Sequence, residues 1–270
     1  MYETERYRHV NVDSTLLAGQ AAQRLGVPLV SFSSRAVYGQ DRYECPSCGT
    51  TFGSQCCNQA VPVPSQESDS LAPVSVYGET KAVAERNLLE GIASEIPVAI
   101  VRPQNVIGPG QALHNPYTGV RAAFLALLRE GKPLNIYGDG SQTRDFVHVA
   151  DLAQLVLWLS ETPPAPGDPV VANSGSGVRT TLLLELANLA IKAAPVPSVP
   201  LKYLDVQRAG DIDHACADPS HSIALGAPQP TLGAADGVTD SIQWGWDRPG
   251  ASAQAWDVAL TELATKGLTS

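Results

Sequence analysis

Apolar residues alternate between helical and strand spacing along the chain, a pattern typical of α/β proteins. Helical spacing covers about residues 10–25 and ends at Gly26, and the short apolar run 27–32 then predicts a buried strand. The same pair of patterns returns as a predicted helix at 74–89 and a predicted buried strand at 98–101. Two such units predict a parallel sheet covered by helices.

The second half of the chain repeats the pattern more weakly. We expect helices at 120–129, 151–159 and 180–191, the last capped by a threonine, a strand at 170–172, and short helices near 219–225 and 253–265. Residues 40–72 are rich in Cys, Pro, Gly and Ser and lack periodicity, so they predict a long ordered loop.

Composition and charge exclude several classes of protein. The chain is 44% hydrophobic and 17% charged, which is not the composition of a disordered or fibrous protein. A net charge of -9 argues against nucleic-acid binding. No apolar run reaches the roughly 18 residues of a membrane span, and no signal peptide is visible at the N-terminus, so we expect a cytoplasmic protein without a membrane segment.

Four of the five cysteines fall close together, at Cys45, Cys48, Cys56 and Cys57. The first two have the spacing of a zinc-ligand pair, whereas adjacent cysteines rarely bind one ion together. The sequence leaves two readings open, a structural zinc site formed by the four thiols and a packed loop without metal.

Tyr77 and Lys81 are the strongest candidate pair for chemistry. Their four-residue spacing places both side chains on one helix face, where an ammonium group would lower the pKa of the phenol. Tyr77 is then a candidate general acid and base. A surface tyrosine and lysine on an amphipathic helix would give the same spacing, and the pair alone does not separate the two interpretations.

Six segments change that balance, because their order is far more specific than any one of them. They are Ser33–Gly39 (SSRAVYG), Val76–Lys81 (VYGETK), Arg102–Gly110 (RPQNVIGPG), Ile136–Asp151, Asn173–Gly177 (NSGSG) and Arg208–Asp211 (RAGD). In this order they resemble the extended short-chain dehydrogenase/reductase family, the NAD-dependent nucleotide-sugar epimerases and dehydratases, over nearly the whole chain.

The resemblance implies a role for each matching residue. It implies catalytic roles for Ser34, Tyr77 and Lys81, cofactor contacts for Tyr77, Lys81 and Gln104, and substrate contacts for Ser33, Asn105, Arg144 and Arg208. The guanidinium groups suit a diphosphate because their planar donors bind phosphate oxygens in pairs. The implied ligands are NAD and a nucleotide sugar.

Three segments look more specifically like dTDP-L-rhamnose 4-epimerase sequences: Ser34–Gly39, Cys45–Gly49 and Gln104–Gln111. Related 4,6-dehydratases carry an acidic pair where this chain has Arg35 and Ala36. Dehydration would lack its two carboxyl groups in this chain. The resemblance therefore implies a 4-epimerase that acts through a 4-keto sugar. The alternatives are a nucleotide-sugar 4-ketoreductase and a catalytically inactive sugar-nucleotide-binding homologue.

One expected feature is missing from the sequence. A Rossmann domain binds the NAD diphosphate at a glycine-rich turn after its first strand, and no such turn precedes Ser33. Roughly 90 residues of the dinucleotide fold are absent by this comparison. The sequence leaves three explanations open, namely a truncated or mis-started enzyme, a degenerate non-enzyme, and a partner chain that completes the sheet. We expect weak or no NAD binding by the chain alone.

We therefore predict an α/β fold, a Rossmann-type parallel sheet that is N-terminally incomplete, with a smaller α+β substrate-binding lobe. The partial dinucleotide-binding domain spans 1–110, contains the Cys-rich insertion 40–72 and is joined by 144–175. The lobe comprises 111–143 and 176–270. The resemblance also implies a possible homodimer.

Overall fold

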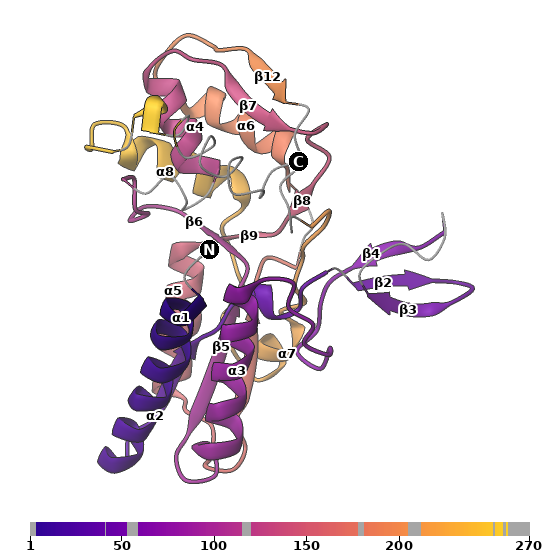
Figure 1. Cartoon of the computed structure of the whole chain (residues 1–270), viewed down its shortest axis with the longest axis vertical. Helices are drawn as coiled ribbons and strands as arrows, with labels where there is room; N and C mark the ends of the chain where they lie inside the picture. Colours follow the sequence, from indigo (N-terminus) through magenta and orange to yellow (C-terminus); the bar gives the residue numbers. More distant parts are fainter. Residues whose placement is uncertain are drawn as a thin grey trace.

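The computed structural model describes residues 4–40, 42–52, 59–114, 120–177, 181–204, 212–250, 252–255 and 258 (Figure 1). Its helices are α1 (Thr4–Arg8), the π-helical η1 (His9–Asp13), α2 (Ser14–Leu25), the 3₁₀-helical η2 (Arg35–Val37), α3 (Val76–Gly91), α4 (Val120–Arg129), α5 (Val149–Glu161), α6 (Leu183–Ala193), α7 (Ser220–Ala224) and α8 (Ala234–Gly245). Its strands are β1 (Leu29–Phe32), β2 (Arg42–Cys45), β3 (Gly49–Phe52), β4 (Val61–Val63), β5 (Val98–Pro103), β6 (Asn105–Ile107), β7 (Leu134–Tyr137), β8 (Thr143–Arg144), β9 (Phe146–His148), β10 (Val170–Ser174), β11 (Thr181–Leu182) and β12 (Leu201–Leu204).

The central layer is a parallel sheet in the order β1-β5-β10. Side chains alternate across β5, so Val98 and Ile100 pack with α2 and α3 while Ala99 and Val101 pack with α5. The four residues are at most 1% exposed, which explains why this strand reads as an unbroken apolar run. Among the described residues β1 pairs only with β5, and its other edge has no strand neighbour.

A second core lies beside the sheet and joins α4, α6 and α8. Phe124, Leu186 and Ile242 are among its buried members. The parallel pair β7-β12 and the antiparallel pair β8-β11 border it, and the parallel pair β6-β9 leads to it from the central sheet. Figure 1 shows this part above the sheet and its helices, as expected for a smaller lobe of mixed secondary structure.

The insertion contains regular structure, which corrects the prediction of a loop at 40–72. It forms a three-stranded antiparallel sheet, β3-β2-β4, that projects sideways in Figure 1 and is called the finger below (residues 42–52 and 59–63). In β2 the burial alternates, with Tyr43 and Cys45 buried and Glu44 exposed. The alternation covers only four residues, too few to stand out from the surrounding Gly, Pro and Ser.

Helix boundaries agree with the sequence at some positions and correct it at others. Helix α2 ends at Gly26, whose φ of 63° places it in the left-handed conformation that favours glycine. Helix α6 begins at Leu183 without a side-chain cap, and the expected cap Thr180 lies outside the described residues. The pattern missed α8, and most of the expected helix at 253–265 lies outside the described residues. Within the described ranges, no helix combines the length and the apolar character that a membrane crossing requires.

Candidate functional site

The candidate site lies where the parallel strands end. Ser33 and Ser34 follow β1, and Gln104 follows β5, so both positions lie at the carboxyl edge of the sheet where ligands bind in open α/β folds. The backbone N–H of Ser33 donates to the carbonyl of Val101 at 2.8 Å, and that of Gln104 donates to Ser174 at 2.8 Å. These bonds continue the sheet pairing beyond the strand ends, so the backbone positions of Ser33 and Gln104 are fixed.

Ser34 occupies the N-cap position of η2. Its backbone is extended, with φ of −164° and ψ of 153°, and its Oγ accepts the N–H of Ala36 at 3.2 Å. A serine prefers this position because its oxygen satisfies a free N–H group of the first turn. The cap holds the hydroxyl at the start of the turn, next to the end of β1.

Helix α3 packs directly on that turn. Ser75 caps the helix by accepting the N–H of Gly78 at 3.1 Å. A Cβ atom at Gly78 would overlap the carbonyl oxygen of Ala36, so only glycine lets the first turn of α3 approach η2 this closely. Because Tyr77 precedes Gly78, the structure brings the elements that carry Tyr77 and Ser34 into contact.

Lys81 lies one helical turn beyond Tyr77. Its Nζ donates to the carbonyl of Phe32 at 2.8 Å, which ties α3 to the end of β1. Burial lowers the pKa of Lys81, although the nearby charge of Glu85 opposes the shift. The ring of Tyr77 meets that of Tyr7 edge to face, with 6.2 Å between the ring centroids.

A buried ion pair fixes α3 against β5. Nη2 of Arg102 lies 2.7 Å from Oε2 of Glu85, and Nε donates to both carboxylate oxygens at 3.0 and 3.2 Å. The two side chains are 5% and 3% exposed, so the pair is dry and geometrically fixed. Its direct consequence is a rigid position for the helix that presents Tyr77 and Lys81.

Two buried side-chain oxygens at the site have no hydrogen-bond partner in the part of the chain that the structure describes. They are Oγ of Ser33 and Oε1 of Gln104, in residues only 6% and 5% exposed. Buried polar atoms in folded proteins are normally paired, so these two fit a bound polar molecule. Gln104 borders a small surface pocket whose lining is Arg35, Tyr38, Gly39, Gln40, Ser65, Gln104, Ala215 and Cys216.

The residues expected to hold the substrate diphosphate are less tightly defined. The N–H of Asn105 donates to the carbonyl of Asp145 at 3.1 Å, so Asn105 lies close to the segment that follows Arg144. Arg144 is buried, and its Nη1 donates to the carbonyls of Thr143 and Asp213 at 2.8 and 3.3 Å. Arg208 lies outside the described residues. The diphosphate roles of these three residues remain predictions.

The zinc prediction is only partly addressed. Cys45 is buried and Cys48 exposed, at the turn between β2 and β3, while Cys56 and Cys57 lie outside the described residues. Within the described ranges no three His, Cys, Asp or Glu side chains form a group that could hold a metal ion. The site made of four cysteines therefore remains a prediction.

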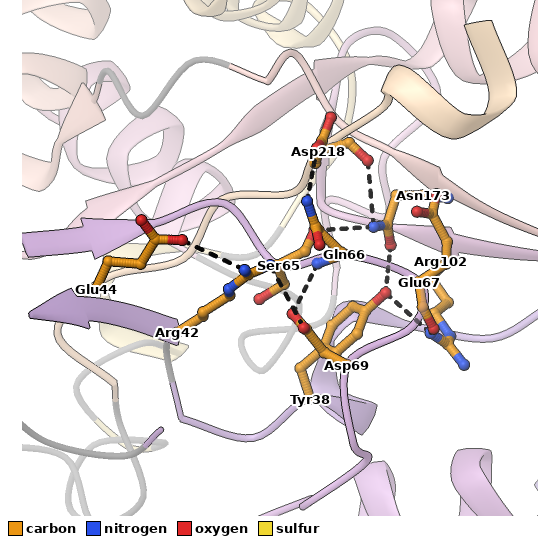
Figure 2. Close-up of polar contacts among 10 residues, drawn as sticks. All are labelled: Tyr38, Arg42, Glu44, Ser65, Gln66, Glu67, Asp69, Arg102, Asn173 and Asp218. Atoms are coloured by element: carbon orange, nitrogen blue, oxygen red, sulfur yellow. Dashed lines mark hydrogen bonds and ion pairs between the residues drawn. The ribbon is translucent and has the colours of Figure 1, made fainter. Parts of the chain in front are cut away.

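Sequence reasoning missed a buried polar cluster below the pocket. Glu67, from the segment that leaves the finger, joins Tyr38, Arg102 and Asn173 there (Figure 2). The last three belong to segments singled out in the sequence, but no pattern connects Glu67 to them. Only the fold brings residues so far apart in the sequence together.

Comparison with known proteins agrees with this geometry. Residues 1–175 match the NAD dependent epimerase/dehydratase family. A dTDP-L-rhamnose 4-epimerase from Burkholderia thailandensis is 32% identical over 261 residues, which cover 90% of this chain and 70% of the relative. A dTDP-4-dehydro-6-deoxy-D-allose reductase from a Streptomyces species is 35% identical over 126 residues, which cover 43% of this chain and 37% of the relative.

A solved structure extends the match to the fold. The UDP-glucose 4-epimerase of Thermotoga maritima with UDP-glucose superimposes with a TM-score of 0.72 at 26% identity, covering 90% of this chain and 71% of that one. The predicted Rossmann-type α/β fold is therefore confirmed, as is the resemblance drawn from the ordered motifs. The chain belongs to the NAD dependent epimerase/dehydratase family.

Proposed function

We propose that this chain supplies the substrate site and the proton-transfer groups of an NAD-dependent nucleotide-sugar 4-epimerase, with a dTDP-deoxysugar as substrate. The observation that carries the proposal is the close contact between two turns. The turn that begins at Ser34 packs against the first turn of α3, which contains Tyr77 and Gly78. The 32% identity to the Burkholderia thailandensis enzyme supports the choice of substrate.

In the proposed reaction, Tyr77 removes the proton from the C4 hydroxyl of the sugar and later returns it. The Ser34 hydroxyl orients the same oxygen, and Lys81, one helical turn beyond Tyr77, supplies a positive charge on the same helix face. NAD held near Lys81 and Gln104 would supply the hydride-transfer chemistry at C4 that inversion through a 4-keto sugar requires. The net change is inversion at C4, without consumption of cofactor.

The residues of this chain fit one end of NAD better than the other. Lys81, Ser33 Oγ and Gln104 Oε1 would hold the nicotinamide end and the substrate; the two oxygens have no hydrogen-bond partner among the described residues. The sequence has no glycine-rich turn for the diphosphate, so we predict weak NAD affinity for the chain alone. Titration calorimetry with NAD measures this, and a micromolar dissociation constant would contradict it.

The turnover test measures interconversion of dTDP-L-rhamnose and its C4 epimer at saturating NAD. Replacing Tyr77 with phenylalanine is expected to lower kcat by about 10²- to 10⁴-fold, because it removes the group that transfers the proton. Tyr203→Phe is the matched control, since Tyr203 is exposed on β12 and should leave kcat unchanged. Wild-type protein that neither binds nor converts dTDP- or UDP-sugars would refute the proposal.

A 4-ketoreductase is the second candidate, favoured by the 35% identity to the Streptomyces reductase over 126 residues. A reductase releases its product after one hydride transfer and consumes NADPH in proportion to product. An epimerase turns over with no net change in cofactor. Following NADPH absorbance in the presence of a 4-keto-6-deoxy nucleotide sugar therefore separates the two functions.

A further inference from the structure

We propose that segment 65–69, which connects the finger to the core, positions the turn that carries Ser34 and acts through the hydroxyl of Tyr38. The inference rests on the proposed function, because the position of Ser34 matters for catalysis only there. Figure 2 shows the cluster, in which segment 65–69 and Tyr38 converge on Arg102 and Asn173.

Tyr38 ends the turn that begins at Ser34. Its hydroxyl accepts from Nη1 of Arg102 at 2.9 Å and donates to Oδ1 of Asn173 at 2.7 Å. Burial raises the pKa of Tyr38 to about 12, against the opposing charge of Arg102, so the phenol stays protonated and keeps donating. Two directional bonds in a dry environment thus fix one end of a turn whose other end is Ser34.

Asn173 transmits the position of the segment to Tyr38. Its Nδ2 donates to the carbonyls of Ser65 and Asp218 at 3.0 and 3.3 Å, and its backbone N–H donates to Oε1 of Glu67 at 2.7 Å. The residue is fully buried, so no solvent can replace these partners. A displacement of Ser65 and Glu67 would therefore move the acceptor of the Tyr38 hydroxyl.

Arg102 provides the second connection. Its Nη1 donates to the backbone carbonyl of Glu67 at 3.1 Å as well as to Tyr38, while its other nitrogens bind Glu85 on α3. One guanidinium group therefore contacts the segment, the Ser34 turn and the helix of Tyr77. Both proposed catalytic elements are fixed relative to the same buried charge.

The segment itself is held at both ends. Asp69 accepts the N–H of Gln66 at 2.7 Å and lies 3.5 Å from Nη1 of Arg42 in the finger. The N–H of Ser65 donates to the carbonyl of Cys216 at 3.0 Å, beside the pocket. The segment is thus anchored to the finger on one side and to the pocket wall on the other, as a positioning element requires.

A network that only stabilised the fold would show the same contacts, so the test must separate positioning from stability. Tyr38→Phe keeps the buried ring and removes only the hydroxyl, and Tyr203→Phe makes the same change at an exposed site. Amide hydrogen exchange is measured at Ala36, Val37 and Tyr38, whose N–H groups bond within the turn. We expect these three amides to exchange roughly tenfold faster in Tyr38→Phe than in wild type, and at the wild-type rate in Tyr203→Phe. Unchanged exchange would overturn the proposal.

Kinetics supply the readout that a purely structural role would not change. At saturating NAD we expect Tyr38→Phe to lower kcat by roughly tenfold with little change in KM. In a Ser34→Ala background the same substitution should cause no further loss, because there is no hydroxyl left to position. Equal losses in both backgrounds would overturn the proposal. Wild-type protein without turnover refutes the proposed function instead, and the exchange measurement then decides whether the network holds the turn.

Glu67 gives a second, independent pair of variants. Glu67→Ala removes the acceptor of the Asn173 N–H, whereas Glu67→Gln retains an oxygen at that position. We expect Glu67→Ala to reproduce the faster exchange at the turn and Glu67→Gln to restore wild-type exchange. Exchange that is the same in both variants would show that Asn173 does not transmit the position of the segment, and would overturn the mechanism.

Discussion

Replacing Glu85 with alanine would leave the charge of Arg102 buried without its carboxylate partner. The ion pair has contacts of 2.7 to 3.2 Å, and its side chains are 3% and 5% exposed, so water cannot substitute for the lost group. Breaking a buried pair on one side costs about 3–5 kcal/mol. Because the free energy of unfolding of an ordinary domain is about 5–15 kcal/mol, the variant should lose about a fifth or more of it.

Urea unfolding followed by circular dichroism measures this loss directly. The control is Glu44→Ala, which makes the same change in an exposed pair with Arg42 at 3.4 Å, where the carboxylate side chain is 57% exposed. That pair should contribute no more than about 1 kcal/mol. If Glu85→Ala cost as little as Glu44→Ala, Arg102 would have to be compensated by another group, and the account of how α3 is fixed would be wrong.

Three further predictions follow from the site. Gly78→Ala places a Cβ 2.9 Å from Cβ of Pro73, well inside ordinary contact distance, so α3 must shift by roughly 0.6 Å or more. We expect kcat in the epimerase assay to fall by at least tenfold. The free energy of unfolding, measured by thermal denaturation, should fall by only about 1–3 kcal/mol. Lys81→Met should lower kcat by roughly 100-fold or more in the same assay, because it removes the positive charge that the proposal assigns to proton transfer and to NAD binding. A variant as active as wild type would exclude Lys81 from proton transfer. Burial raises the pKa of Glu67 above its ordinary value near 4.5, so the native state holds this proton more tightly than the unfolded chain and native stability falls as pH rises through that window. The free energy of unfolding of Glu67→Gln minus that of wild type should therefore increase from pH 4 upward in urea titrations, and a constant difference would contradict the shift.

Local patterns predicted the elements whose own sequence determines them. The fully apolar run of β5 and the left-handed glycine after α2 each have a direct physical cause within a few residues. Helix α8 was missed because its buried face includes Gly237, Ser241 and Gly245, which carry little hydrophobic signal. A Cβ at Gly237 would meet the side chain of Ile107, so close packing and not hydrophobicity determines that face.

The candidate site shows the same limit. The four-residue spacing of Tyr77 and Lys81 could be read from the sequence because both belong to one helix. The partners of Asn173 could not, since Tyr38 lies 135 residues away and Glu67 lies 106 residues away. Contacts of that separation depend on the topology of the sheet, for which the sequence offers no local pattern.

The sequence separation of those contacts also determines when they can form during synthesis. Gln66 and Asp218 lie 152 residues apart, and Ser65 bonds to Cys216, so the base of the finger cannot close until residue 218 has left the ribosome. Until then Asn173 lacks one of its hydrogen-bond acceptors, the carbonyl of Asp218, and the N-terminal strands and helices fold without that bond. Contacts between residues so far apart form slowly, so the pocket that Ser65 and Cys216 line can close only after this part of the chain has been synthesised.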